Sequence, residues 1–401
     1  MNALDDIRIV DVSQNLAGPF CTYILAELGA DVVKVEAPGG DPARAWGPPF
    51  WNGEGTIFLS GNRSKRSLAV DLKAESGREI VRVLAARADV FVQSFRAGVA
   101  ESLGFGYDDV AALNPRIIYC SVTAYGTRGP LRDLPGYDLL MQAHAGLVSV
   151  TGQPGRPARV GSSVVDMGTG MWSAIGVLAA LARRRRTGRG EHVVTSLYET
   201  TLTWNAYHLM NYLAAGAVAR PSGTAFPLIA PYEAFPTSDG ELMIAVATDG
   251  LFRRLCEALA LPDLPADDRF ADNPSRVANR VVLVERIAAA TRELSTAALE
   301  SRLREAGVPC APILGIDAVA DAEQTHASGI VQRVPHPGIP DFASLALPVE
   351  WDGRRAQPRC APPRCGEHTH EILRELGYDD PAITRLKRER VIRAYPATEG
   401  V

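Results

Sequence analysis

Short β-rich runs alternate with helical patterns through the first half of the chain, and this alternation limits the possible folds more than any other feature. Helical patterns at 19–28, 77–87 and 107–113 separate several of these runs. Strands that are connected by helices pair in parallel and are covered by helices on both faces. We therefore predict an α/β fold with a large, doubly wound parallel sheet of the Rossmann-like kind. The expected strands are 7–12, 31–36, 68–72, 90–92, 117–122 and 192–197.

The length of 401 residues exceeds one typical core, so we expect more than one domain. The composition shifts near Ala219-Arg220-Pro221-Ser222-Gly223, which is typical of a linker. A β-hairpin pattern and three helical patterns follow it. We predict a large domain from 1–218, a smaller α+β domain from 219–318 and a C-terminal segment from 319–401.

The charge balance argues against a nucleic-acid-binding protein. The chain has 42 Lys plus Arg and 46 Asp plus Glu, for a net charge of −4. A nucleic-acid binder would usually carry a clustered basic excess.

Three features favour a cytoplasmic protein without a membrane span. The N-terminal residues 1–6 are acidic and lead directly into a strand, unlike a signal peptide. The longest apolar stretch, 168–182, falls short of the roughly 20 residues that span a bilayer, so we interpret it as a buried helix. The six cysteines show no disulfide framework, which indicates a reducing compartment.

One cluster of metal-ligating residue types lies near the C-terminus, at Cys360, Cys365, His368 and His370. Its spacing is too tight for an ordinary zinc finger, and Pro362-Pro363 stiffens the loop. We therefore expect no metal site.

The ligand crevice of a doubly wound sheet lies beyond the carboxyl ends of its strands. In this chain those ends carry Ser13–Pro19, Ser94–Arg96 and Thr123–Gly126. The first turn contains Ala17-Gly18-Pro19 where a dinucleotide-binding turn would have G-x-G-x-x-G, and the chain has no G-x-x-x-x-G-K-[ST]. The sequence therefore argues against a nicotinamide dinucleotide or P-loop nucleotide site.

Asp166 is the strongest single candidate for catalysis. It follows an apolar pair, 164–165, that is typical of the end of a buried strand, and it precedes a buried-helix pattern at 171–182. At such a junction a helix dipole and unpaired N–H groups would hold the pKa of the carboxyl group down. Gly168 and Gly170 would leave room for the close approach of a ligand. The spacing alone leaves an ordinary N-cap as the alternative.

Short distinctive segments are spread over nearly the whole chain. They are Leu16-Ala17-Gly18-Pro19, Leu28–Glu36, Gly40–Arg44, Asn62–Ser67, Gly136-Tyr137-Asp138 with Gln142, Thr187–Gly190, Pro231-Tyr232, Asp239-Gly240, Gly307–Pro312 and Gly366–Thr369. In this order they resemble the family III CoA-transferases, which include formyl-CoA transferase and carnitine CoA-transferase. The resemblance implies that family's fold.

The resemblance also implies an acyl-CoA:carboxylate CoA-transferase in which Asp166 is the nucleophile. The carboxylate would attack the thioester of a donor acyl-CoA and form a mixed anhydride, then an aspartyl-CoA thioester, before the acceptor acid reverses the steps. Covalent catalysis of this kind conserves the free energy of the thioester. No permanently bound cofactor is expected, since CoA and acyl-CoA are substrates.

Contacts with CoA carry over from the family by position. They are Leu16 and Ala17 at the thioester end, Val70 and Lys73 beside the nucleotide, Ser94, Phe95 and Arg96 in the next loop, and Tyr137 and Asp138 near the reacting groups. Lys73 has the alternative of a solvated residue after a strand. Tyr137 and Asp138 have the alternative of fixing a loop or packing in the core. The chain reads Gln-Ser-Phe at 93–95 where relatives commonly read Glu-Asn-Phe, which leaves the hydrogen bonding there open.

The same resemblance implies three further properties. An interlocked homodimer is expected, because the chain leaves the large domain, builds the small one and returns. Ser222-Gly223-Thr224 is the nearest candidate for a loop that closes the site. The expected substrates are a donor acyl-CoA, for which we choose succinyl-CoA, and a small carboxylic or dicarboxylic acid.

Two other functions stay open at this point. The α-methylacyl-CoA racemases resemble the first half of the chain, but they use a histidine in a Gly-His-Asp run where this chain has Gly136-Tyr137-Asp138. A phenol with a pKa near 10 is a poor substitute for imidazole, and His144 lies seven positions later. A non-catalytic CoA-binding protein is the second alternative.

Overall fold

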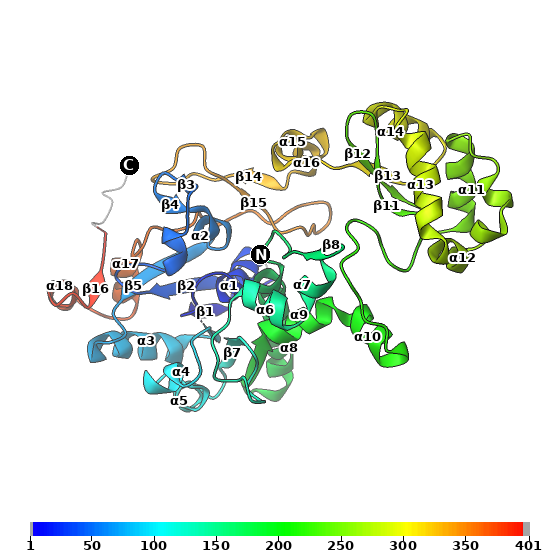
Figure 1. The fold of residues 1–401 in the computed structure, drawn as a ribbon. Coiled ribbons are helices and arrows are strands. Elements are labelled where there is room, and N and C mark those ends of the chain that lie inside the picture. Colours follow the sequence, from blue (N-terminus) through cyan, green and yellow to red (C-terminus); the bar gives the residue numbers. More distant parts are fainter. Residues whose placement is uncertain (1–2, 396–401) are drawn as a thin grey trace. The chain divides into compact units, whose positions relative to one another are not determined.

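The computed structural model describes residues 3–395 (Figure 1). Residues 1, 2 and 396–401 lie outside that range. They include the first two residues of the acidic N-terminal stretch and the outer ends of the predicted segments 1–218 and 319–401.

A seven-stranded sheet forms the centre of the fold. Its order is β10-β7-β6-β1-β2-β5-β16, and every pairing is parallel except that of β16 with β5. The sheet is doubly wound, because the chain proceeds outward in both directions from β1, as in a Rossmann fold. The antiparallel edge strand β16 was not predicted, since two residues are too short to leave a pattern. The strands are β1 (Arg8–Asp11), β2 (Asp31–Glu36), β5 (Lys65–Val70), β6 (Val90–Gln93), β7 (Ile118–Thr123), β10 (Glu191–Ser196) and β16 (Ile392–Arg393).

Helices cover both faces of this sheet. Successive side chains of a strand point to opposite faces, and the core divides accordingly. Ile9 and Val32 pack with α1 (Ala17–Glu27) and α8 (Val164–Thr187). Val10 and Val33 pack with the helices of the other face, which are α3 (Glu75–Arg87), α5 (Tyr107–Leu113), α17 (Thr369–Glu375) and α18 (Asp380–Arg388).

Two predicted elements are wrong. Residues 164–165 form the first turn of α8 and not the end of a strand. The helix expected from about 198 to 215 is divided at Asn205 into α9 (Leu197–Trp204) and α10 (Ala206–Ala215). The Asn205 side chain donates a hydrogen bond to the Ala145 carbonyl at 2.9 Å, so a tertiary contact forms at the break.

Helix α8 contains the apolar stretch 168–182, which we interpreted from the sequence as a buried helix. Its 24 residues make it, within residues 3–395, a helix long and apolar enough by composition to cross a bilayer, although half of its most apolar stretch is buried inside the protein. A core helix of a globular protein meets the same criteria. Helix α8 packs against α1 and the sheet, as expected for a buried helix.

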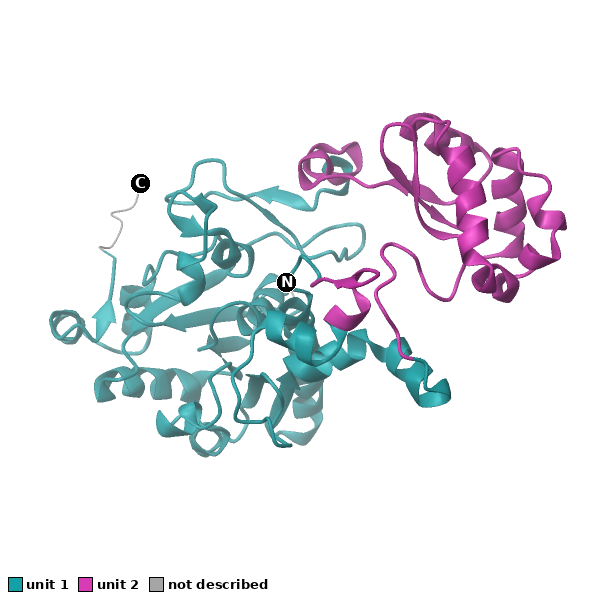
Figure 2. Cartoon of the chain, viewed as in Figure 1, with its two compact units in different colours: residues 1–147, 160–217, 326–401 teal, residues 148–159, 218–325 magenta. Residues whose placement is uncertain are grey.

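The chain divides into two compact units (Figure 2). The larger comprises 1–147, 160–217 and 326–401, and it contains the parallel sheet. The smaller comprises 148–159 and 218–325, where the sequence placed boundaries at 219 and 318. Residues 148–159, whose short hairpin includes Gly152, were not assigned to it from the sequence; the Gly223 N–H donates to the Gly152 carbonyl at 2.8 Å.

The smaller unit has its own core. Three antiparallel strands in the order β11-β12-β13 pack against helices, so the unit has an α+β architecture. Its elements include β11 (Tyr232–Pro236), β12 (Glu241–Ala245), β13 (Cys310–Pro312), α11 (Asp249–Ala258), α13 (Arg280–Thr291) and α14 (Thr296–Glu305).

Candidate active site

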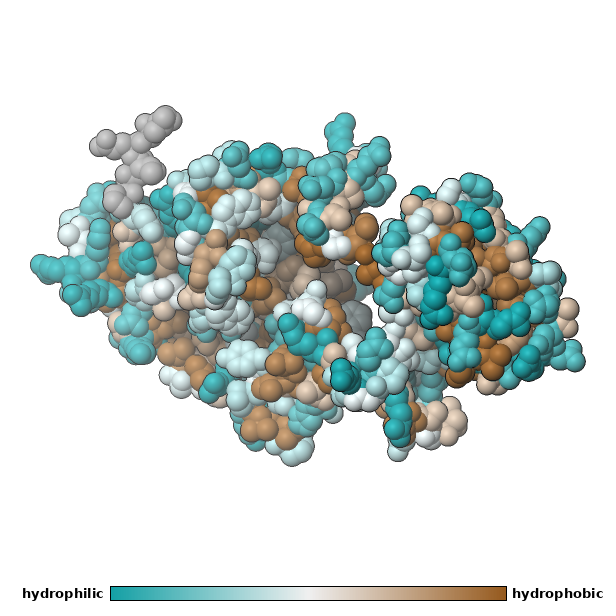
Figure 3. Space-filling view, turned by 45° about the horizontal axis from the view of Figure 1, so that its top comes forward, coloured by the Kyte–Doolittle hydropathy of each residue, from teal (hydrophilic) through white to brown (hydrophobic). Residues whose placement is uncertain are grey.

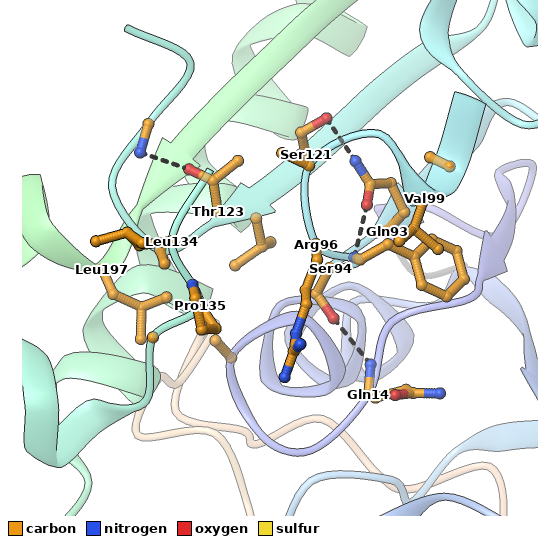
Figure 4. A pocket seen from close by; sticks show the side chains of 18 of the residues that line it. Gln14, Gln93, Ser94, Arg96, Val99, Ser121, Thr123, Leu134, Pro135 and Leu197 are labelled. Atoms are coloured by element: carbon orange, nitrogen blue, oxygen red, sulfur yellow. Dashed lines mark hydrogen bonds between the residues drawn. The ribbon is translucent and has the colours of Figure 1, made fainter. Parts of the chain in front are cut away.

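A cavity of about 690 Å³ opens at the carboxyl ends of β1, β6 and β7 (Figure 4). This volume lies in the range of small-molecule sites. Its wall includes residues of the three strand-end loops that the sequence predicted, among them Gln14–Ala17, Ser94–Arg96 and Thr123–Ala124. The cavity thus lies at the switch point of the doubly wound sheet, where β1 and β6 are neighbours.

Helix α1 begins at the cavity wall. Leu16 is its N-cap, and Leu16 and Ala17 both line the cavity. Asn15 has a left-handed φ of 66°, which asparagine tolerates better than most residues. The N–H groups in the first turn of a helix lack acceptors within the helix. The turn therefore presents backbone donors at the cavity wall.

A buried ion pair between Lys34 and Asp41 is hydrogen-bonded to the backbone that leads into this turn. The Lys34 ammonium lies 2.8 Å from the Asp41 carboxylate and donates to the Ser13 carbonyl at 3.0 Å. The other Asp41 oxygen accepts from the Asn15 N–H at 3.2 Å. Both charged side chains are almost fully buried, so each depends on the other for its charge.

A second buried pair holds the start of α1. The Lys65 ammonium lies 3.2 Å from the Asp11 carboxylate and donates to the Pro19 carbonyl at 2.8 Å. Burial lowers the pKa of Lys65 to about 8, against the raising effect of the Asp11 charge. Neither ion pair was predicted from the sequence. For Asp11, Lys34 and Lys65 the available signal was a charge inside a strand of a parallel sheet, where both faces are normally apolar.

Asp166 lies in the first turn of α8 and lines the cavity. Its position follows from the packing of α8 on α1. A Cβ atom on Gly170 would lie 2.7 Å from the Ala17 carbonyl oxygen, and one on Gly168 would lie 2.5 Å from the Trp204 ring. Both glycines therefore allow helices to pack closely. The expectation that they leave room for a ligand is wrong.

Asp138 caps the helix that carries Asp166. Its Oδ2 accepts hydrogen bonds from the Val165 N–H at 2.8 Å and the Asp166 N–H at 3.1 Å. Its Oδ1 accepts from the Gln142 amide at 2.5 Å. Asp138 is buried and does not line the cavity, whereas its half-exposed neighbour Tyr137 does. The structure thus gives Asp138 a helix-fixing position, the alternative left open from the sequence.

The Asp166 carboxyl group has a pKa raised to about 7, first by its burial and second by the negative charge of Asp138. The expectation of a lowered pKa is wrong. The N–H groups that were expected to stabilise the Asp166 carboxylate are the ones that bind Asp138. Across residues 3–395, the Asp166 side chain forms no hydrogen bond or ion pair that would compensate.

The loop after β6 forms another part of the wall. Ser94, Phe95 and Arg96 all line the cavity. Arg96 is exposed, and in the described part of the chain its guanidinium has no ion-pair partner. Arg132 is a second lining arginine, at 3.4 Å from the Asp133 carboxylate. The cavity thus holds one carboxyl group with a raised pKa and, in Arg96, a cationic group that is free to bind an anion.

Comparison with known proteins assigns this chain to a family. The model of CoA-transferase family III matches residues 4–369. This chain belongs to that family.

Over most of its length, this chain is also similar in sequence to individual proteins. It is 38% identical to mouse (Mus musculus) succinyl-CoA:glutarate CoA-transferase, with 98% of this chain and 91% of the relative covered. It is 37% identical to succinyl-CoA:mesaconate CoA-transferase of Haloarcula marismortui, with 94% and 98% covered. A solved structure of a CAIB/BAIF family protein from Brucella suis matches with a TM-score of 0.84 and 37% identity, covering 94% of this chain and all of the other. The chain is therefore a CoA-transferase.

Two predicted CoA contacts of this transferase lie away from the cavity. Val70 is fully buried in the core of the sheet, and its side chain packs with α3 and α17 residues. Lys73 is exposed, and its N–H donates to the Asp71 carboxylate at 2.9 Å. Neither residue lines the cavity. Contact of Val70 and Lys73 with the nucleotide of CoA stays a prediction.

The cysteine–histidine cluster near the C-terminus is divided among separate partners. Cys360 Sγ contacts the Lys65 carbonyl at 3.6 Å, and Cys365 Sγ contacts the Ala37 carbonyl at 3.7 Å. His368 accepts from the Ser67 N–H at 3.3 Å. Among residues 3–395, no group of three or more candidate ligands is arranged to hold a metal ion.

The candidate lid, Ser222–Thr224, is hydrogen-bonded within the smaller unit. The Ser222 hydroxyl donates to the Ala225 carbonyl at 2.7 Å, and the Thr224 hydroxyl accepts from the Ala234 N–H at 3.0 Å. Its role in closing the site stays a prediction.

Proposed function

We propose that this CoA-transferase moves CoA from succinyl-CoA to a small dicarboxylic acid, with Asp166 as the covalent nucleophile. The observation that carries the mechanism is a carboxyl group at the wall of a strand-end cavity, with a pKa raised to about 7 and no cation among residues 3–395 paired with it. A carboxylate with a raised pKa is a stronger nucleophile than an ordinary aspartate, and much of it is ionised at neutral pH. The substrate choice rests on the activities of the mouse and Haloarcula relatives.

The first half-reaction removes the donor acid. An Asp166 carboxylate oxygen attacks the thioester carbonyl carbon, the C–S bond breaks, and a mixed anhydride and CoA thiolate form. The thiolate then attacks the Asp166 carbonyl carbon of the anhydride. The donor leaves as its carboxylate, and Asp166 carries CoA as a thioester.

The second half-reaction runs the same steps in reverse. The acceptor carboxylate attacks the aspartyl-CoA thioester and releases the thiolate, which then attacks the acceptor carbonyl of the new anhydride. Acceptor acyl-CoA leaves, and the Asp166 carboxylate is restored. The bond energy of the thioester is retained throughout, so the exchange needs no nucleoside triphosphate.

Each step passes through an oxyanion that needs hydrogen-bond donors already in place. The first turn of α1, at Leu16 and Ala17, supplies the best-placed candidates, because it lines the same cavity as Asp166. The backbone at Gly168 and Gly170 is a poorer candidate, since both residues pack against neighbouring helices. One such donor is worth about 3 kcal/mol in other enzymes.

Arg96 supports the binding of CoA, whose phosphates carry several negative charges. It lines the cavity without a bound carboxylate in the described chain. A guanidinium binds phosphate with paired hydrogen bonds. We therefore propose that Arg96 contacts a CoA phosphate, with Ser94, Phe95 and Tyr137 in the same wall.

The racemase alternative lacks its histidine at the expected position in this cavity. Tyr137 stands where a racemase histidine would stand, and His144 does not line the cavity. The His144 ring is instead 2.9 Å from the Tyr125 hydroxyl. A non-catalytic CoA-binding role is opposed by the family to which the chain belongs.

A homodimer is part of the proposal. Helix α10 is largely apolar and has no buried residue, with Met210 61% exposed and Leu213 68% exposed. On α8, Met171 and Ile175 are also exposed. Hydrophobic side chains reach the surface of the larger unit at several places (Figure 3). Large exposed apolar faces mark interaction sites, and a second copy that interlocks with the first would cover these.

A cytoplasmic location is proposed with it. All six cysteines are free thiols in the structure, which suits a reducing compartment.

The mechanism is tested by replacing the nucleophile. Asp166→Ala is expected to lower acyl exchange between succinyl-CoA and glutarate by at least about 10³-fold, because no other group can form the anhydride. Binding of CoA, measured by calorimetry, should change little. Asp321→Ala, at an exposed aspartate of the smaller unit, is the matched control and should exchange normally.

Trapping gives a direct readout of the intermediate. Hydroxylamine added during turnover should convert Asp166 to a hydroxamate that peptide mass spectrometry detects. Steady exchange with residue 166 unmodified, or exchange retained in Asp166→Ala, rejects the covalent mechanism.

A further inference from the structure

A chain of hydrogen bonds joins cavity-lining residues of three neighbouring strands, and Figure 4 shows the part of it around Gln93. The Phe95 N–H donates to Gln93 Oε1 at 2.7 Å, and Gln93 Nε2 donates to Ser121 Oγ at 2.9 Å. Ser121 Oγ lies 2.9 Å from His192 Nε2. Gln93, Ser121 and His192 belong to β6, β7 and β10. The sequence drew attention to Gln93 through the Gln-Ser-Phe run, but not to Ser121 or His192.

The direction of these bonds follows from the groups that make them. A backbone N–H can only donate, so the Gln93 atom facing Phe95 must be the amide oxygen. The Gln93 nitrogen then faces Ser121, and the Ser121 oxygen accepts from it. The single Ser121 hydroxyl proton remains for His192 Nε2. This arrangement favours a neutral His192 that accepts at Nε2 and carries its proton on Nδ1.

The surroundings of His192 favour the same neutral state. Tyr107 stacks on its ring at 4.8 Å, and Tyr119 meets it edge-on at 5.2 Å. Burial lowers the pKa of His192, while the nearby charges of Asp108 and Glu101 oppose that shift without reversing it.

The same loop is tied to the turn that opens α1. The Ser94 hydroxyl accepts from the Gln14 N–H at 3.0 Å, which joins the loop after β6 to the loop after β1. Gln93 is only 8% exposed, and its two hydrogen bonds keep the backbone at Phe95 in one orientation. The loop after β6, which the buried Gln93 side chain orients, is therefore hydrogen-bonded to the loop after β1, and both loops line the cavity.

We propose that Gln93 is a positioning residue for CoA binding, which orients the Ser94–Arg96 wall and is itself oriented through Ser121 by a neutral His192. The proposal rests on the proposed function, in which this wall contacts CoA. Gln93 acts through Phe95 and Ser94 and need not touch the reacting atoms. Asp166 and its cap Asp138 lie outside this hydrogen-bonded chain, so the chemical step should not depend on it.

The first test separates positioning from simple stability. Gln93→Ala is expected to raise KM for succinyl-CoA and Kd for free CoA on the order of tenfold, the equivalent of about 1.4 kcal/mol. The kcat for exchange with glutarate should stay within about threefold of the native value. A variant that was merely less folded would instead lose apparent kcat at an unchanged KM. Unchanged KM and Kd in Gln93→Ala overturn the proposal.

The second test reads the hydrogen-bond direction and needs no activity. In Gln93→Glu the introduced carboxylate still accepts from Phe95 but cannot donate to Ser121, so the Ser121 hydroxyl turns toward it. His192 must then donate from Nε2, and the added negative charge favours its protonation. The pKa of His192, followed by NMR titration of its ring protons, should rise by about one unit or more.

His208 of α10 provides the control in the same spectra, because it lies outside the cavity. Its titration should be unchanged in Gln93→Glu. An unmoved His192 pKa in a folded Gln93→Glu protein overturns the proposal even if Gln93→Ala fails to fold. Absence of CoA exchange in the native protein, by contrast, rejects the proposed function and leaves the NMR result to decide the hydrogen-bond chain.

Discussion

At the scale of single residues, the reactivity of Asp166 is set by another aspartate. Asp138 uses the N–H groups at the start of α8 for its own carboxylate, and its charge then acts on Asp166. A helix N-terminus ordinarily favours a nearby anion. Here that effect stabilises the cap, so the nucleophile keeps a pKa near neutrality.

The pH profile of the enzyme should reflect this pKa. Asp166 is nucleophilic only when ionised, and its pKa is raised to about 7. We expect kcat/KM for succinyl-CoA to fall about tenfold per pH unit as the pH drops below 7, and to level off above it. Stopped assays in buffers of constant ionic strength from pH 5 to 9 measure the profile. An acidic limb centred near 4 would contradict the assignment.

Removal of the Asp138 charge should move that limb. In Asp138→Asn the side-chain oxygen can still accept a hydrogen bond from the start of α8, but the repulsion of Asp166 is gone. The pKa of Asp166 should fall, and the acidic limb of kcat/KM should shift to lower pH. Asp133→Asn serves as the control, since its carboxylate lies 3.4 Å from Arg132 in the same cavity wall. A limb that does not move would show that burial alone sets the pKa.

At the scale of secondary-structure elements, the site depends on how closely α8 approaches α1. The hydrophobic pattern was sufficient to predict both helices and most strands, because both faces of the sheet are buried. It could not predict that α8 begins at Val164, because that start depends on a cap from Asp138, which lies 27 positions before the Val165 N–H that it binds. The roles of Gly168 and Gly170 were also misinterpreted, because the sequence pattern does not show which helices pack against them.

A single methyl group at this contact should be costly. Gly170→Ala adds about 1 kcal/mol of helix propensity, but its Cβ would lie 2.7 Å from the Ala17 carbonyl oxygen. Overpacking of this kind costs about 1–3 kcal/mol. We expect a net decrease in the free energy of unfolding, measured by urea denaturation, together with a lower kcat because Asp166 shifts relative to the α1 turn.

The control for this change is Gly161→Ala, where no atom lies within 4 Å of the added Cβ. Its stability and kcat should match those of the native protein. A more stable and fully active Gly170→Ala protein would contradict the close-packing explanation.

At the scale of the whole molecule, a single copy of the chain leaves apolar surface uncovered. Helix α10 has the composition of a packed helix and no buried residue. Stable interfaces bury about 800 Å² on each partner. Exposed apolar helices on the larger unit could supply such an area, which is the physical basis for the proposed dimer.

Solution mass tests the dimer directly. Sedimentation equilibrium should give twice the mass of the chain, and the double variant Met210→Asp with Leu213→Asp should lower the dimer fraction or the yield of soluble dimer. Leu113→Asp is the control, because Leu113 is 46% exposed on α5, away from α10. A monomeric native protein would contradict the proposal.

The sequence by itself determined the alternation of strands and helices, the three loops that line the cavity, and the identity of Asp166 as the residue to test. These are local properties, since periodicity, turn residues and segment order are readable without knowing which parts of the chain meet. The tertiary structure decided the pKa of Asp166, the packing role of Gly168 and Gly170, the burial of Val70 in the core of the sheet, and the hydrogen-bonded chain through Gln93. Each of these depends on groups far apart in the sequence that share one buried environment, where an N–H group can satisfy one carboxylate and leave its neighbour unpaired.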